Sequence, residues 1–295
     1  MLSLKFGYKN NTICLEKIFK THKLERVIIL IFSKEELQQE VIRWQNRLVK
    51  SCVICKGVGS IEKPGTTKAI MCKCQEQSML NAHLVAAGIP RKYLNSTWNW
   101  DGINSNKEAT NKARNYSSNF IQNYFDGKGL YIYGRQGRGK SLLESLIARD
   151  VAAKVNPDNG KKFRVAFIIF EEFVQLSHRA RSDFEARKQV DSLIENPDLL
   201  IIDNIGSETG TQTYNTKFLE FILRKRDNNS VPTIISSNYT PEQLIEPYSD
   251  TVHDFIVQNN ELIFVQGDNH RKKTADLFDE TFNDAEFLLG ENVDE

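Results

Sequence analysis

Eight consecutive residues near the middle of this sequence have the spacing of a phosphate-binding loop. They fit the pattern G-x-x-x-x-G-K-[ST] and are Gly134, Arg135, Gln136, Gly137, Arg138, Gly139, Lys140 and Ser141. Backbone N–H groups in such a turn, together with a helix N-terminus, bind phosphate oxygens. We expect Lys140 to reach the β- and γ-phosphates of a nucleotide and Ser141 to bind Mg²⁺. The next residue, Leu142, completes the predicted nucleotide-binding set.

The segments on either side of this loop are those that a phosphate site needs. Residues 129–133 form an apolar run that predicts a buried strand, and residues 141–148 have the spacing of a helix with an apolar face. A strand, a glycine-rich turn and a helix N-terminus in this order favour a phosphate site over an ordinary turn.

Two polar residues further along the chain follow apolar strand-like runs. Asp203 directly follows the run 199–202, and Asn238 directly follows the run 233–237. Ligands of parallel sheets bind at the carboxyl ends of the strands, so we expect Asp203 to hold Mg²⁺ together with Ser141. Asn238 would orient the attacking water or contact the γ-phosphate, and the alternative for it is a turn-forming asparagine.

Four of the five cysteines form a second candidate site, with the spacing Cys52-x₂-Cys55-x₁₆-Cys72-x-Cys74. Two close pairs of thiolates can close a tetrahedral Zn²⁺ site, and four protein ligands leave no open position for catalysis. We therefore predict a structural zinc module, with an iron–sulfur cluster as the alternative. The remaining cysteine, Cys14, is interpreted as a small buried apolar residue.

The pattern of elements predicts an α/β fold with a mostly parallel sheet flanked by helices. Between about 107 and 270 helical and strand-like segments alternate, and the predicted strands are 129–133, 164–169, 199–202, 233–237 and 262–265. Helices are expected at 76–93, ending at Gly88-Ile89-Pro90, and at 107–125, and an earlier strand is expected at 27–32. A further amphipathic helix in the first 50 residues, after Ser33, would pack on the core or dock a partner.

Composition and charge limit the class of protein. With 40% apolar and 26% charged residues the chain is typical of a soluble domain, and no apolar run approaches the ~20 residues that span a bilayer. The N-terminus lacks the pattern of a secretory signal, so we expect a cytoplasmic protein without a membrane partner. Residues 275–295 carry eight acidic and no basic residues, so the rest of the chain is net basic. This balance is compatible with nucleic-acid binding but is weak evidence for it.

Four segments together resemble the DnaC/DnaI-type AAA+ ATPases, the replicative helicase loaders of bacteria and phages. These segments are 131–141, 199–206, 232–238 and 267–271, and the resemblance covers about 85 to 275. It implies an AAA+ P-loop core that binds ATP and Mg²⁺, self-assembles with nucleotide between subunits, and acts on a replicative helicase and single-stranded DNA. Together with the cysteine spacing and the acidic C-terminal residues, it predicts four parts, which are a partner-docking segment (1–50), a zinc-binding module (51–80), the ATPase domain (85–275) and an acidic tail (276–295).

The chain departs from the pattern of that family at two places. The family usually has an acid after the Asp203 position, where this chain has Asn204, and an amide can position water but cannot accept its proton. Glu208 is the candidate substitute. The family often has a Ser-Arg pair around 252–256, whose arginine reaches a neighbour's γ-phosphate, and here Phe255 follows Asp254. We therefore expect ATP binding with slow or partner-dependent hydrolysis.

Several basic residues are candidates for other contacts. The resemblance implies that Arg271 contacts nucleotide or a subunit interface, whereas Arg226 is interpreted as a helix-surface residue. The residues proposed to face single-stranded DNA, or else to form a solvated helix face, are His178, Arg179, Arg181, Arg187 and Lys188. Trp98 and Trp100 could stack on bases, but packing on the domain is the favoured interpretation.

The function predicted from these features is an ATP-binding AAA+ helicase loader in DNA replication. An IstB-type transposition helper shares the core motifs, but the cysteine module disfavours it. A nucleotide-gated adaptor with little hydrolysis is the third hypothesis, and Asn204 supports it.

Overall fold

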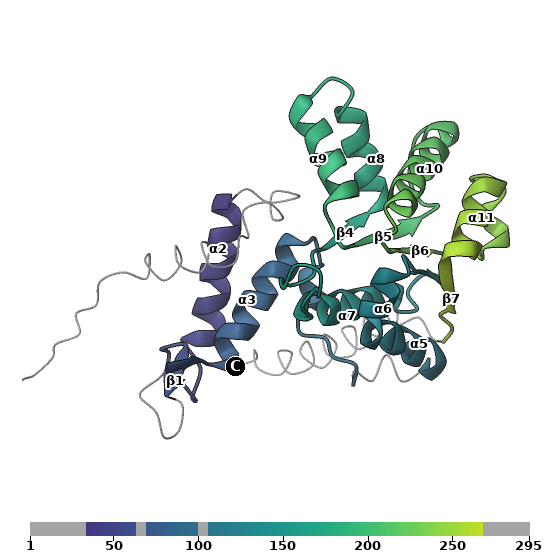
Figure 1. The fold of residues 1–295 in the computed structure, drawn as a ribbon. Coiled ribbons are helices and arrows are strands. Elements are labelled where there is room, and N and C mark those ends of the chain that lie inside the picture. The colour runs from purple at the N-terminus through teal and green to yellow at the C-terminus, as the bar shows by residue number, and fades with distance from the viewer. Residues whose placement is uncertain (1–33, 63–68, 100–105, 268–295) are drawn as a thin grey trace, which may run out of the picture.

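The computed structural model describes residues 34–62, 69–99 and 106–267, and the structural statements below concern those residues. Its centre is a five-stranded sheet with the strand order β4-β5-β6-β3-β7 (Figure 1). Every neighbouring pair in this sheet runs parallel. The strands are β3 (Gly129–Tyr133), β4 (Val165–Ile169), β5 (Leu199–Ile205), β6 (Thr233–Ser237) and β7 (Asn260–Phe264).

Helices cover both faces of the sheet, which is why its central strands are apolar on both sides (Figure 1). One face packs on α5 (Lys107–Ser118), α6 (Phe120–Phe125) and α7 (Lys140–Ala153). The other face packs on α8 (Phe170–Arg179), α9 (Phe184–Glu195), α10 (Gln212–Asn228) and α11 (Asp250–Asn259). Successive strand residues point to opposite faces, so Leu130 and Ile132 join the first core and Tyr131 joins the second.

The N-terminal part of the described chain is joined to the same core. It comprises α2 (Lys34–Trp44), the π-helical turn η3 (Gln45–Val49), strands β1 (Ser60–Glu62) and β2 (Ala69–Met71), and α3 (Lys73–Ala86). Strands β1 and β2 pair antiparallel. Trp44 is buried in the core that α7 shares, and Arg91, in the short 3-10 turn η4 (Arg91–Tyr93), donates to both carboxylate oxygens of Glu40. Because of these contacts, α2 packs as part of the globular body.

The predicted α/β class, parallel sheet and five strands are confirmed. Two helix predictions were wrong in their bounds. The predicted helix 107–125 is two helices that separate at Asn119. The predicted helix 76–93 spans 73–86, and its expected end at Gly88-Ile89-Pro90 is confirmed, since Gly88 takes a φ of +89° after the last helical turn and Pro90 follows. The predicted strand at 27–32 lies outside the described residues.

The described helices were also compared with the length and hydropathy that a bilayer requires. None of them is long and apolar enough to span a membrane.

Candidate functional site

The loop between β3 and α7 takes a shape that only glycine allows at two of its positions. A Cβ on Gly134 would collide with the carbonyl oxygen of Val265, which follows β7. Gly139 caps α7 with a φ of +100°, in the left-handed region, and a Cβ there would meet nothing within 4 Å. The loop thus leaves open space above the helix N-terminus, where backbone N–H groups and the helix dipole favour an anion.

Lys140 is the first residue of α7, and its side chain turns back across this loop. It is 7% exposed, and its Nζ donates to the carbonyl oxygens of Gly134 (2.7 Å) and Arg135 (3.3 Å). It also donates to Oδ1 of Asn238 at 2.7 Å. The structure therefore brings the predicted lysine and the predicted asparagine into direct contact, although 98 residues separate them in the chain.

Asp203 lies in β5 between two hydroxyl groups that come from different elements. Its Oδ2 accepts from Ser141 Oγ on α7 at 2.9 Å, and its Oδ1 accepts from Ser236 Oγ on β6 at 2.7 Å. The side chain is nearly buried, at 8% exposure. A serine hydroxyl beside a carboxylate is the oxygen ligand pair that suits Mg²⁺, so the residues present fit this ion.

Asn204 follows Asp203 but its side chain bonds a different partner. The pairing of β5 with β6 is irregular between Ile202 and Ile205, and Asn204 takes a φ of +66° there. Its Nδ2 donates to Ser207 Oγ, and its backbone N–H donates to Ser236 Oγ. Asparagine tolerates the left-handed conformation better than most residues, so this position has a backbone reason for its residue type.

Glu208 is also engaged in the loop after β5. Its Oε2 accepts from the N–H of Gly206 at 2.7 Å, and its Oε1 accepts from the hydroxyl of Tyr248 at 2.5 Å. The carboxylate that sequence reasoning offered in place of the missing acid is therefore used to hold this loop.

Glu144 lies beside the site and was not among the residues predicted from the sequence. It lies on α7, three residues after Ser141 and four after Lys140, so all three share one face of the helix. Its exposure is 0%, and neither carboxyl oxygen has a hydrogen-bond partner. Burial raises the pKa of Glu144 well above its ordinary value, and Asp203 raises it further, while Ser236 and Lys140 oppose the shift. A charged residue on the apolar side of the P-loop helix was the signal in the sequence.

The four clustered cysteines converge at the junction of η3, the β1–β2 hairpin and α3. Their sulfur atoms all lie within 4.8 Å of one another, with Cys55–Cys74 at 3.5 Å and Cys52–Cys72 at 3.9 Å. Tetrahedral zinc with bonds of about 2.3 Å separates its sulfurs by roughly 3.8 Å, so the donor set fits this ion. Burial opposes ionisation of Cys55, but the N–H of Gly59 and the neighbouring thiols lower its pKa to about 6. Burial and the neighbouring thiols raise the pKa of Cys74.

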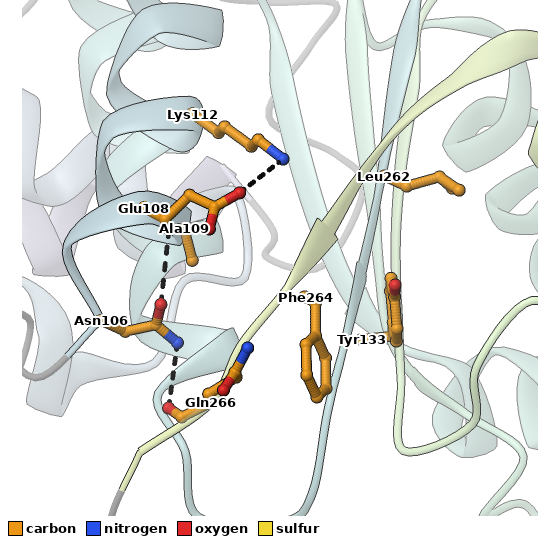
Figure 2. A pocket seen from close by; sticks show the side chains of 8 residues that line it. All are labelled: Asn106, Glu108, Ala109, Lys112, Tyr133, Leu262, Phe264 and Gln266. Carbon is orange, nitrogen blue, oxygen red and sulfur yellow. Dashed lines mark hydrogen bonds and ion pairs between the residues drawn. The ribbon is translucent and has the colours of Figure 1, made fainter.

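A pocket of about 280 Å³ lies where β3 and β7 end beside the first turn of α5 (Figure 2). The side chains of Asn106, Glu108 and Lys112 are partnered with one another or with backbone. Asn106 donates to the carbonyl oxygen of Gln266 at 3.0 Å, and Lys112 pairs with Glu108 at 3.1 Å. Tyr133 stacks on Phe264 at its rim, with ring centroids 5.2 Å apart. None of the predicted site residues lines this pocket.

Comparison with known families identifies the domain that carries the P-loop. The family model of the bacterial DnaA ATPase domain matches residues 95–256, which is more than half of the chain. The chain belongs to this ATPase family. The match begins before α5 and ends within α11, so the ATPase domain contains the whole arrangement around Lys140 and Asp203.

The individual proteins similar to this chain include helicase loaders. The replicative helicase loader DnaI of Bacillus subtilis is 27% identical over 130 residues, which cover 43% of this chain and 39% of that relative. The chain thus matches well under half of the length of that curated relative. A solved structure of the DnaC helicase loader superposes with a TM-score of 0.50 at 23% identity and covers 60% of this chain and all of that one. A Streptococcus pyogenes protein described as a primosome component superposes equally well, covering 64% of this chain and 97% of that one. The two solved structures show the shared fold, and the match to DnaI confirms the resemblance to helicase loaders.

One arginine of this ATPase domain differs from its predicted position. Arg226 was predicted on the surface, and this was wrong: it is 1% exposed. Its guanidinium donates to Thr233 Oγ1 and to the carbonyl oxygens of Ile194, Pro197 and Pro232, so it ties α10 to β6 and to the end of α9. Arg271 lies outside the described residues.

The predicted DNA-facing residues lie at the end of the α8–α9 hairpin, the pair of helices that projects from the sheet (Figure 1). The ring of Tyr214 on α10 stacks with His178 and lies under the guanidinium of Arg181, so both residues also pack within the ATPase domain. Arg179, Arg187 and Lys188 are exposed. Trp98 packs on the core and donates to Asp150 at 2.9 Å, as the packing interpretation expected, while Trp100 lies outside the described residues.

Proposed function

We propose that this chain is an ATP-binding helicase loader of DNA replication, which delivers a replicative helicase to single-stranded DNA. The observation that carries the proposal is the meeting of Lys140, Asp203 and Asn238 at the carboxyl ends of β3, β5 and β6, within a DnaA-family ATPase domain. The helicase partner rests on the likeness to DnaI, whose name states that role.

Each residue has a role in this proposal that follows from its contacts. The loop Gly134–Ser141, Leu142 and Arg271 would bind the nucleotide, with Lys140 exchanging its carbonyl partners for phosphate oxygens. Ser141 and Asp203 would hold Mg²⁺, which neutralises charge on the phosphates. Asn238 follows β6 and accepts a hydrogen bond from Lys140. This contact would change when Lys140 binds the γ-phosphate, so Asn238 would respond to a bound γ-phosphate.

Hydrolysis would be slow in the isolated protein. The amide of Asn204 bonds Ser207, the carboxylate of Glu208 bonds Tyr248, and residues 252–256 on α11 contain no arginine. An arginine supplied by another subunit or protein raises phosphoryl-transfer rates by ~10³–10⁵ where it operates. This geometry favours a loader whose turnover depends on a partner, and it equally supports the second candidate, a nucleotide-gated adaptor.

The N-terminal part would present the partner surface. We propose that segment 1–50 and the zinc-binding module 51–80 dock the helicase, that the ATPase domain 85–275 assembles with further copies and contacts single-stranded DNA, and that 276–295 forms an acidic tail. The exposed apolar side chains of the cysteine module support a docking role, and they include Val53, Ile54 and Val58. A bound Zn²⁺ would hold this module in its described shape.

A pull-down with purified hexameric replicative helicase tests the proposal. The full chain with ATP and Mg²⁺ should retain the helicase, and Lys140→Ala should lose the ATP dependence of that retention. A transposase serves as the competing bait. Retention of the transposase alone would support an IstB-type helper, and retention of neither protein would overturn the loader function.

An ATPase assay then separates the loader from the adaptor. Turnover is measured for the chain alone, with single-stranded DNA, and with helicase and DNA together. Stimulation by partner and DNA supports the loader, whereas ATP binding without turnover under all three conditions supports the adaptor.

A further inference from the structure

Glu144 is buried beside the nucleotide site, close to Asp203 and Ser236, and its carboxyl group makes no well-formed hydrogen bond. Neither oxygen has a hydrogen-bond partner, at an exposure of 0%. Leaving a buried carboxyl without partners is costly, so a group that merely fills the core should be apolar. The unpartnered carboxyl therefore points to a ligand that is bound during function.

The neighbours of Glu144 identify the chemistry of that ligand. The side chains that act on its carboxyl are Asp203, Ser236 and Lys140. Asp203 bonds the hydroxyl groups of Ser141 and Ser236, so two carboxyl groups and two hydroxyl groups gather at one point. Oxygen donors of this kind, with two carboxylates whose charges repel each other, suit a divalent cation.

We infer that Glu144 is a second carboxylate of the Mg²⁺ site, acting on the water shell of the ion from the P-loop helix. The inference rests on the proposed ATP·Mg²⁺ function and names an additional residue of that site. Glu144 is a positioning residue in this assignment, because it acts through the ion and its waters and not on the phosphates. It replaces the negative charge that the residue after Asp203, the neutral Asn204, does not provide.

The test is the Mg²⁺ dependence of nucleotide binding. Binding of a fluorescent, non-hydrolysable ATP analogue is measured in EDTA and then across a Mg²⁺ titration, for the full chain and its variants. For Glu144→Gln we expect the Mg²⁺ midpoint to rise about 10- to 100-fold, as for other groups that orient a metal's ligands, with binding in EDTA unchanged. Glu144→Leu, which restores an apolar core side chain, should show the same shift.

Two further variants calibrate the titration. Ser145→Ala changes the next buried residue of α7, whose hydroxyl donates to the carbonyl oxygen of Ser141, and should keep the wild-type midpoint. Asp203→Asn should raise the midpoint at least as much as Glu144→Gln. Melting temperatures without nucleotide check that each variant is folded.

The outcomes distinguish the two proposals. A wild-type Mg²⁺ midpoint in both Glu144 variants, with intact nucleotide binding, overturns the role of Glu144 and leaves the proposed function standing. Absence of Mg²⁺-dependent binding in the wild-type chain overturns the nucleotide function and the role of Glu144 with it.

Discussion

Asp203 shows how single residues of this site depend on the backbone around them. It accepts hydrogen bonds from α7 and β6 at once, at the bulge where the pairing of β5 with β6 becomes irregular. The bulge places Asn204 at a φ of +66°, a conformation that costs most non-glycine residues about 1–3 kcal/mol. The neutral residue after Asp203 is thus suited to the local backbone as well as to slow hydrolysis.

Substitution of Asn204 tests this backbone explanation. Asn204→Glu, which installs an acid at this position, should lower the free energy of unfolding by about 1 kcal/mol relative to Asn204→Gly, because glycine adopts positive φ without strain. Chemical denaturation of both variants measures the difference. Ser207→Ala is the control, since it removes the hydroxyl that bonds the amide and the carbonyl oxygen of Asn204 while residue 204 itself is unchanged. Equal stability of the glutamate and glycine variants would show that backbone strain at the bulge does not explain the residue type at position 204.

At the scale of elements, α2 is held to the domain by an ion pair as well as by Trp44. Arg91 lies 2.6 Å from Glu40, which is nearly buried while Arg91 is half exposed. The hydrogen bonds and charge of Arg91, with a smaller contribution from Arg43, lower the pKa of Glu40 below 4.5 against the effect of burial. A lowered folded-state pKa stabilises the fold above the unfolded value and loses this effect as pH falls through the folded value.

The Glu40 ion pair predicts a pH-dependent stability difference. Glu40→Gln should cost about 1 kcal/mol of unfolding free energy at pH 7, and this difference should disappear as the pH falls below 4.5. Urea denaturation at a series of pH values measures it. Glu62→Gln, at an exposed position in β1, should cost little at any pH. A cost for Glu40→Gln that persists in acid would assign its role to packing.

The cysteine module predicts that the protein binds a structural metal ion at the four clustered cysteines. We expect one zinc per chain by elemental analysis, lost in Cys72→Ser and retained in Cys14→Ser. The first variant should also lower the melting temperature, because Cys72 is buried between η3 and α3. Strong visible absorption of the purified protein would instead indicate an iron–sulfur cluster.

At the scale of the whole molecule, function depends on which edges and tips of the fold face a partner. The nucleotide residues lie at the carboxyl ends of the strands, the α8–α9 hairpin projects beyond the sheet, and the cysteine module lies at the other end of the described chain (Figure 1). Nucleotide, DNA and helicase would therefore contact separate regions of one subunit.

The exposed basic residues at the hairpin predict a salt-dependent DNA contact. Removing Arg179, Arg187 and Lys188 together should weaken binding of single-stranded DNA and reduce the slope of log affinity against log salt by about 0.7 per lost phosphate contact. Fluorescence anisotropy at several salt concentrations measures both. Lys161→Ala, in the exposed loop before β4 and so at the opposite end of that strand from α8, is the matched control. An unchanged slope in the triple variant would assign these residues to a solvated helix face.

Local patterns in the sequence were sufficient to predict the parallel sheet, the P-loop, Asp203 and the cysteine cluster. Each of these depends on short-range spacing, such as apolar runs of strand length, a glycine-rich turn before a helix, or two close cysteine pairs. The sequence also pointed to the helicase-loader group, because several motifs occur in one order. Helix bounds were less predictable, as at Asn119, because backbone conformation at single residues decides them.

Only the tertiary structure decided which side chains are buried together. Arg226 looks like a surface residue in a helix, but the ends of α9 and β6 present carbonyl oxygens that bury its guanidinium. Glu144 looks like one charged residue among many, and only the meeting of α7, β5 and β6 places its carboxyl beside Asp203. Lys140 and Asn238 meet for the same reason. Sequence patterns report on neighbours along the chain, whereas burial and charge at this site are produced by elements that are far apart in sequence.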